Sequence, residues 1–374
     1  MKYKVVALAC ILLFISVTPA SSIINGKASV GSDYVVTMLF GDEKSSHCTG
    51  AYLRPRVVVT AAHCVIKAGS RTPELTRPIQ DWYVLQPGID WQNSDIKSSK
   101  VKVLKIWTDP DYFNRWEPEK GLRETQVNDI AFLFLDRELN GPTVSRAANR
   151  EEIESFRLGQ GRAFHLGYGC IGETWENRKN NDGRPYLAED IVGTNIGSLS
   201  TPIWDRFLLA QYQAGKGEVC SGDSGSPLLM KKGSEVLYLG SIFAGGNGPN
   251  GIKYASTTVL WPFVPALDEA YSKFLIEDAQ NRELKAKQEA EAKAAAEFKA
   301  RQEIEAAAVK AAEELKAKQE AELKAKQEAE LKAAQVAAAK SAAMQKITIS
   351  CIKGKTVKKI TGFKPICPKG FKRK

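Results

Sequence analysis

"CSGDSGSPLL", residues 220–229, places an acid and a hydroxyl side by side between glycines. The acid is Asp223, the hydroxyl belongs to Ser224, and the flanking residues are Gly222 and Gly225. A serine in such a turn becomes a nucleophile only if the fold supplies a base, a group that orients the base, and donors for an oxyanion. These partners have to come from elsewhere in the chain.

The chain has three histidines, so the candidates for a base are few. His63 ends a β-branched run, "VVVTAAHCV" (57–65), whereas His47 precedes Cys48 and His165 lies in "AFHLGYG" (163–169). Short β-branched and aromatic runs of this kind recur up to about residue 274, separated by Gly, Pro, Asn and Asp. This pattern predicts many short antiparallel strands in a barrel or sandwich.

Four motifs occur in a fixed order: "CTGAYL" (48–53), "TAAHC" (60–64), "NDIAFLFL" (128–135) and "GDSGSP" (222–227). Together they resemble the chymotrypsin–trypsin family of serine proteases. "IINGKASVGSDYVVTML" (23–39), "VKVLKIWTDPDYF" (101–113), "GYGC" (167–170) and "YLGSIFAGG" (238–246) extend the resemblance. It covers residues 23 to about 274 and implies an all-β domain of two six-stranded antiparallel β-barrels.

The resemblance implies a catalytic triad. Ser224 is then the nucleophile, His63 the general base and later the acid, and Asp129 the group that orients the imidazole. The backbone N–H groups of Gly222 and Ser224 would form the oxyanion hole. Such an enzyme is a serine endopeptidase that hydrolyses protein or peptide substrates and needs no cofactor and no metal. The sequence also has no recognisable acidic cluster for calcium.

Asp223 is expected to act in activation. In the family this acid pairs with a new N-terminal ammonium and shapes the oxyanion turn, and here that ammonium would belong to Ile23. Cleavage after Ser22 would expose Ile23 directly, and cleavage after Ala20 would leave two residues to trim. We therefore expect activation at or soon after export.

The residues expected to bind substrate depart from the family pattern. Glu218, six residues before the nucleophile, corresponds to the base of the primary pocket, where a carboxylate would attract Lys or Arg side chains. The alternative is that the extra Gly217 displaces Glu218, which is then a loop charge. Phe243 and Ala244 replace a polar–aromatic pair beside the cleft, next to Gly245. The exchange at Phe243 removes a hydrogen bond to the triad aspartate.

An even number of cysteines remains after the N-terminal signal, and this favours disulfides in an exported chain. The resemblance implies a Cys48–Cys64 bond beside the catalytic histidine. Cys220 lacks its usual late partner, which leaves Cys170, and two free thiols are the alternative. Cys351 and Cys367 are expected to close a small loop near the C-terminus.

Residues 1–22 have the organisation of a secretory signal peptide: Lys2 and Lys4, an apolar run from Val5 to Val17, then small residues. The run is too short to span a bilayer comfortably, and no later stretch could span one. An uncleaved anchor is the alternative. The sequence thus predicts a secreted, extracellular protein.

The globular part, residues 23–275, is followed by two further segments. Residues 276–345 consist mostly of Ala, Lys, Glu and Gln without Pro or Gly, which predicts a long α-helix continuing the helix "ALDEAYSKFL" (266–275). Leu315, Leu323 and Leu331 recur every eight residues and so form no single seam. This spacing favours a solitary helical spacer over a coiled coil.

Residues 346–374 are a basic tail module with ten Lys or Arg and no acid, although the whole chain has a net charge of +10. The remainder sums to zero, so a nucleic-acid-binding core is not indicated. The tail is expected to favour anionic cell-surface polymers, or else to be merely solvated. The alternative to an enzyme is a catalytically silent protease homologue that acts as a surface-attached binding protein.

Overall fold

The computed structural model describes residues 23–24, 26–29, 34–40, 48–67, 73–112, 127–172, 177–195, 201–247 and 252–374. The expected signal peptide and His47 lie outside these residues. The chain divides into two compact units, one up to Ala279 and one from Gln280 to Lys374.

Six antiparallel strands close the first barrel in the order β2-β3-β4-β7-β6-β5. They are β2 (Val35–Phe40), β3 (Cys48–Arg54), β4 (Val57–Thr60), β5 (Trp82–Val84), β6 (Val101–Thr108) and β7 (Ala131–Leu135). Every residue of β4 and β7 is buried, as expected for apolar strands at the centre of a sheet. Their register pairs Thr60 with Ala131, so the end of β4 lies beside the start of β7.

The second barrel is built from the order β10-β11-β14-β13-β12-β9, and β9 also pairs with β10. Its strands are β9 (Ala163–Gly167), β10 (Tyr186–Thr194), β11 (Phe207–Gln211), β12 (Pro227–Lys232), β13 (Glu235–Asn247) and β14 (Lys253–Val259). The short strands β1 (Lys27–Ala28) and β8 (Arg146–Ala147) join β10 and β13. The predicted pair of six-stranded antiparallel barrels is confirmed.

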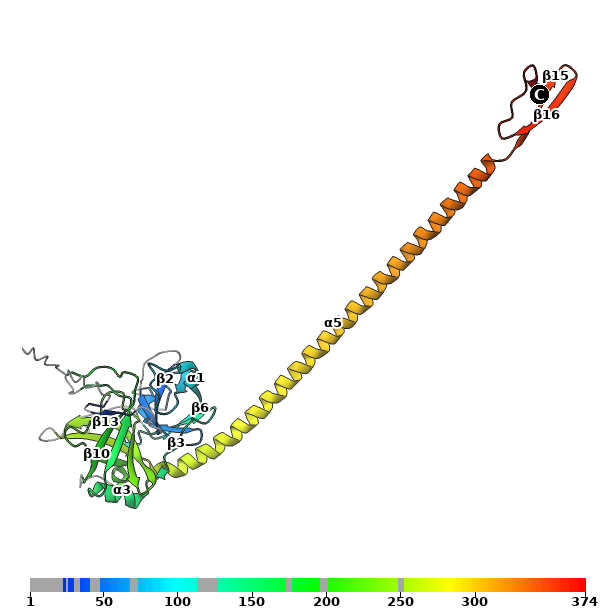
Figure 1. Cartoon of the computed structure of the whole chain (residues 1–374). Helices are drawn as coiled ribbons and strands as arrows, with labels where there is room; N and C mark the ends of the chain where they lie inside the picture. The colour runs from blue at the N-terminus through cyan, green and yellow to red at the C-terminus, as the bar shows by residue number, and fades with distance from the viewer. Residues whose placement is uncertain are drawn as a thin grey trace, which may run out of the picture. The chain divides into compact units, whose positions relative to one another are not determined.

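The two barrels lie side by side, the first in blue and cyan and the second in green (Figure 1). One hydrophobic cluster contains residues of both, among them Val57 and Phe134 of the first and Leu229 and Tyr238 of the second. Short helices complete the unit: η1 (Ala62–Cys64), η2 (Ile79–Asp81), α1 (Ile96–Ser99), α3 (Arg150–Arg157), α4 (Thr201–Arg206) and η5 (Trp261–Phe263). The shared cluster fixes one barrel against the other.

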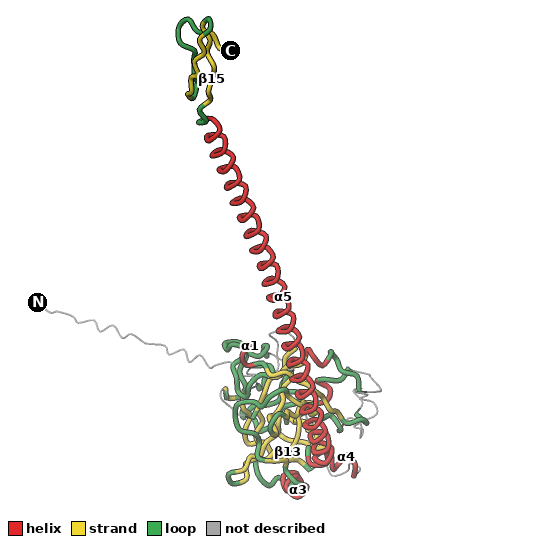
Figure 2. The backbone as a smooth tube through the Cα atoms, turned by 90° about the vertical axis from the view of Figure 1, so that its right-hand side faces the viewer, coloured by secondary structure: helices red, strands yellow, loops and turns green. Residues whose placement is uncertain are grey.

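Helix α5 (Val264–Ala343) begins against the first barrel, where Figure 2 shows its first turns over the strands. Leu267, Ala270 and Phe274 are its buried apolar side chains, and Phe274 stacks on Phe134 with ring centroids 5.0 Å apart. Arg56 forms an ion pair with Asp278 at 2.9 Å. The predicted continuation of the C-terminal helix into one long helix is confirmed.

From Ala279 to Ala343 every residue of α5 is exposed, as the even distribution of its few apolar residues implies. Among the described residues, no helix is long and apolar enough to cross a membrane.

The C-terminal module is a small sheet of β15 (Ile347–Lys353), β16 (Thr356–Gly362) and β17 (Lys372–Arg373), with β15 in the middle. A disulfide joins Cys351 to Cys367, and only Ile349 and Cys351 are buried. The ten Lys and Arg side chains of this module are all exposed. Such a small core needs the covalent link, because little apolar surface is buried.

Candidate active site

His63 and Asp129 meet at the paired ends of β4 and β7. His63 lies in η1, which begins two residues after the end of β4, and Asp129 lies two residues before the start of β7. The backbone N–H of His63 donates to Oδ1 of Asp129 at 2.8 Å, and Nδ1 of His63 lies 2.7 Å from Oδ2. Two contacts to one carboxylate fix the plane of the imidazole and leave Nε2 for another partner.

The Asp129 carboxylate is only 7% exposed, and the His63 side chain is 27% exposed. Burial lowers the pKa of His63, but the charge of Asp129 and its hydrogen bond outweigh this effect and raise the pKa above the ordinary value. The Asp129 carboxylate therefore stabilises the imidazole when it becomes protonated.

Tyr112 is a further partner of Asp129. The buried Tyr112 hydroxyl donates a hydrogen bond to the carboxylate, and burial together with the Asp129 charge raises the pKa of Tyr112. This contact supplies Asp129 with a hydroxyl donor of the kind that the exchange at Phe243 was expected to remove. Tyr112 belongs to the "VKVLKIWTDPDYF" stretch, but the sequence contained no signal for the direction of its hydroxyl.

A polar chain anchors the residue before Asp129. The Asn128 side chain donates to Oδ1 of Asp109 at 3.1 Å and accepts from Nη1 of Arg206 at 2.7 Å. Arg206 ends α4, which precedes a strand of the second barrel. Both barrels thus contribute to the position of the Asp129 segment.

Ser224 lies against β3 and against η1, the turn that contains His63. Its carbonyl accepts from the backbone N–H of Thr49 at 2.8 Å, and it lies 3.7 Å from Sγ of Cys64. A Cβ at Gly225 would lie 2.1 Å from Oγ1 of Thr60, so only glycine allows this close approach. The structure thus brings the segments of Ser224, His63 and Asp129 together at one place.

The turn before Ser224 exposes two N–H groups. Gly222 has φ +97°, in the region that favours glycine, and its carbonyl accepts from Oγ1 of Thr49 at 2.9 Å. Within the described part of the chain, the N–H groups of Gly222 and Ser224 have no protein acceptor, whereas that of Asp223 bonds to Cys220. Two adjacent free donors can bind a negatively charged oxygen.

The Asp223 carboxylate is completely buried behind this turn. Its two oxygens accept from the backbone N–H groups of Gly169 and Cys220, each at 2.8 Å. Burial nevertheless raises the pKa of Asp223 to about 7. Ile23 is also completely buried, and its N–H donates to the carbonyl of Cys170 at 2.9 Å.

His165 lies close to Asp223, although sequence reasoning gave it no role. Its Nδ1 is 2.9 Å from the Tyr212 hydroxyl, and its Nε2 is 3.9 Å from Oδ1 of Asp223. Burial lowers the pKa of His165 to about 3, so the ring is neutral. It is therefore a second histidine beside an acid, but one with no exposure to a substrate.

The expected substrate-binding residues are not all in one place. Phe243, Ala244 and Gly245 lie on β13, where Ala244 and Gly245 are exposed. Glu218 instead lines a cavity of about 440 Å³ together with Tyr212 and Lys253, and none of the three β13 residues lines that cavity. The expected pocket containing all four residues is therefore not seen as one cavity.

The expected disulfides are present beside the site, as Cys48–Cys64 and Cys170–Cys220. Among the described residues, one group has ligand atoms close enough to hold a metal ion: Cys48, His63 and Cys64. Its two sulfurs are joined in a disulfide and are not thiolates, so this group does not fit a metal.

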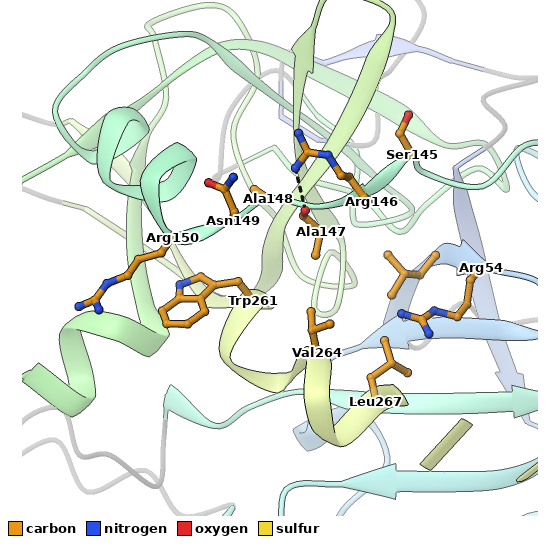
Figure 3. Close-up of a pocket in the computed structure, with 11 residues that line it drawn as sticks. Arg54, Ser145, Arg146, Ala147, Ala148, Asn149, Arg150, Trp261, Val264 and Leu267 are labelled. Carbon is orange, nitrogen blue, oxygen red and sulfur yellow. Dashed lines mark hydrogen bonds between the residues drawn. The ribbon is translucent and has the colours of Figure 1, made fainter. Parts of the chain in front are cut away.

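Another cavity, of about 450 Å³, lies at the start of α5 (Figure 3). Arg146, Arg150 and Trp261 are among its lining residues, and the Arg150 guanidinium lies 5.7 Å from the centre of the Trp261 ring. Arg146 and Arg150 are engaged in ion pairs with Glu152 and Asp205. None of the three expected triad residues lines this cavity.

Comparisons with known proteins agree with the fold. The family model described as Trypsin matches residues 23–265, and the chain therefore belongs to the trypsin family. It is 24% identical to a trypsin-like protease of Streptomyces glaucescens over 60% of this chain and 73% of that protein. It is 24% identical to the ovochymase of Halocynthia roretzi and 25% identical to mouse (Mus musculus) complement factor I, over 60% and 61% of this chain.

The matched regions span only 13% of the ovochymase and 35% of complement factor I. Among solved structures, the chain is similar to the secreted serine protease VesC from Vibrio cholerae, with 20% identity and a TM-score of 0.46. That alignment covers 65% of this chain and 47% of VesC.

The contact between His63 and Asp129 can be tested by titration. In Asp129→Asn, burial is no longer opposed by a neighbouring charge, so the pKa of His63 should fall below its ordinary value of 6.5. Nuclear magnetic resonance of the imidazole in a Ser224→Ala background measures it. Asp111→Asn removes an exposed carboxylate near Tyr112 and should leave the pKa of His63 unchanged. An unchanged pKa in Asp129→Asn would contradict the assignment.

Proposed function

We propose that this protein is a serine endopeptidase that works through an acyl-enzyme. Nε2 of His63 takes the proton of the Ser224 hydroxyl as Oγ attacks the peptide carbonyl carbon. The carbonyl oxygen becomes an oxyanion and is bound by the N–H groups of Gly222 and Ser224. His63 then gives its proton to the leaving amine, and water releases the acyl group by the same steps in reverse order.

The observation that carries this proposal is the pairing of His63 with Asp129 beside a turn that has two free N–H groups. The base becomes positive during the reaction, and the buried carboxylate stabilises that charge. The free donors lie where negative charge would develop. A base without oxyanion donors, or donors without a base, would lower the activation barrier by less.

Substrate would bind along β13. Ala244 to Asn247 pair with β14 on one side, and no pairing on the other side is found among the described residues. An extended peptide can therefore add to this edge through main-chain hydrogen bonds, as strand addition does elsewhere. Such binding suits protein or peptide substrates in general.

In the alternative function, a catalytically silent homologue has the substrate cleft but does not hydrolyse peptide bonds. Nothing in the residues favours it, since His63, Asp129 and Ser224 are all present. The two functions differ in one measurable property, the reactivity of the Ser224 hydroxyl.

A fluorophosphonate probe should label the secreted protein at Ser224. Ser224→Ala should abolish labelling, and Asp129→Asn should slow it by about 10⁴-fold, the loss that the same exchange causes in this type of triad. Ser226→Ala serves as the matched control, because Ser226 lies in the same loop but is completely buried. Absence of labelling in fully processed protein would support the silent homologue.

We also propose that the protein is exported and becomes active when Ile23 is the first residue. Its ammonium would then lie next to the Cys170 carbonyl, close to the buried Asp223. In the uncleaved chain no described residue places a charged cation against that carboxylate, since the nearby His165 is neutral, and its pKa is about 7. A new positive charge would stabilise the ionised form and hold the turn that carries Gly222 and Ser224.

This activation predicts a pH-dependent difference in stability. In uncleaved Ser224→Ala protein, folding raises the pKa of Asp223 from 3.8 to about 7, so between these pH values unfolding releases the proton of this carboxyl. Stability, and with it the melting temperature, should therefore fall as the pH rises through this interval. The full effect corresponds to about 4 kcal/mol. In protein that starts at Ile23 the fall should disappear. Thermal melts between about pH 4 and 8 measure both, with Asp223→Asn as control; parallel curves would contradict the pairing.

We further propose that the C-terminal module binds anionic surface polymers. All ten of its basic side chains are exposed and no acid lies among them. Its sheet and disulfide would hold these charges on a fixed scaffold. Binding of this kind is electrostatic and is weakened by salt.

The full chain should bind dextran sulfate beads at low salt, whereas a chain ending at Gln345 should not. Salt at about 1 M, where the screening length is about 3 Å, should release the full chain. Neutral dextran beads are the control. Tail-dependent binding that persists in high salt would exclude the electrostatic explanation.

A further inference from the structure

Glu218 and Val219 lie next to each other before the nucleophile turn and face different surroundings. Glu218 forms an antiparallel bridge with Ile24, and its N–H donates to the Ile24 carbonyl at 3.0 Å. In such an extended segment, successive side chains point to opposite sides. Glu218 lines the cavity that it shares with Lys253, while Val219 packs toward β13.

Val219 fills the space beside the open edge of β13. A Cβ built on Gly245 would lie 2.3 Å from Cγ1 of Val219, so the valine methyl is in direct contact with the Gly245 backbone. Val219 is only 7% exposed and belongs to the core of the second barrel. A substrate side chain that enters next to Gly245 therefore meets an apolar wall.

Glu218 already has a cation. Nζ of Lys253 lies 3.6 Å from Oε2 of Glu218, and the two side chains are 30% and 15% exposed. The Lys253 backbone is held in place, because its carbonyl accepts from the Tyr212 N–H at 2.9 Å and it pairs with Asn247 at the start of β14. The pair carries no net charge, so its attraction for a second cation is weak.

We propose that Val219 and Lys253 determine the primary specificity, so that the enzyme cleaves after small apolar residues such as alanine and valine rather than after lysine or arginine. This inference rests on the proposed endopeptidase function. It replaces the preference expected from Glu218 alone, since that expectation required a carboxylate facing the cleft without a resident cation.

Size and charge together determine which substrate side chain fits beside Gly245. A guanidinium that enters beside Gly245 would meet the Val219 methyl, and at Glu218 it would compete with Lys253 for the same carboxylate. A large aromatic ring would need the space that the Val219 methyl occupies. A methyl or isopropyl group needs only apolar contact, which Val219 and the Gly245 backbone provide.

Peptide anilides that differ only in the residue before the cleaved bond test the proposal. The enzyme concentration is set by titration with the fluorophosphonate probe. We expect kcat/KM to be at least tenfold higher for alanine and valine than for arginine and phenylalanine, the size of effect that pocket shape provides. The double variant Val219→Gly with Lys253→Met should raise kcat/KM for arginine at least tenfold and lower it for valine.

Lys216→Met is the matched control, because Lys216 is in the same loop but pairs with Asp190 on the surface at 3.3 Å. It should leave the order of substrates unchanged. An arginine preference in the wild type that Glu218→Gln abolishes would overturn the proposal, and so would a phenylalanine preference. Protein that does not react with the probe would instead count against the endopeptidase function itself.

Discussion

The geometry of the site depends on one buried negative charge, the Asp129 carboxylate. Removing a carboxylate from water costs several kcal/mol unless donors compensate it. Two donors come from His63 and one from Tyr112, so the charge is satisfied only when the ends of β4 and β7 are in register. A shift of either strand would leave the charge unpaired. The same contacts that orient the imidazole therefore also hold the first barrel closed at this end.

The second barrel contains a contrasting carboxylate. Asp223 is buried as deeply as Asp129, yet among the described residues its only donors are two neutral backbone N–H groups, and its pKa is about 7. The charge of Asp129 is thus fully compensated by donors in the folded chain, whereas that of Asp223 is not. Since Asp223 lies between Gly222 and Ser224, any cation that reaches it also acts on the turn with the free N–H groups. The N–H of the buried Ile23 bonds to the carbonyl of Cys170, next to Gly169, whose N–H binds this carboxylate.

Local patterns in the sequence were sufficient for the many short strands and the long helix, whereas the two-barrel arrangement and the roles expected of His63, Asp129 and Ser224 came from the resemblance of short motifs to a known family. β-branched runs, helix-forming composition and short motifs are properties of neighbouring residues. Tyr112 and Lys253 could not be assigned in this way, because each acts on a residue far away in the sequence, and the direction of a side chain follows from packing. Glu218 shows the consequence: its position before the nucleophile suggested a free carboxylate, whereas the fold places Lys253 3.6 Å away.

The long helix changes character at Asp278 for an energetic reason. Up to that residue it buries Leu267 and Phe274 against the first barrel, and Arg56 binds Asp278. Beyond it, the described residues of α5 bury no side chain, so stability has to come from intrinsic propensity and from surface pairs such as Lys285–Glu289, each worth only about 0.2–0.5 kcal/mol. The barrels therefore depend on precise packing, whereas the helix beyond Asp278 depends on its amino-acid composition alone.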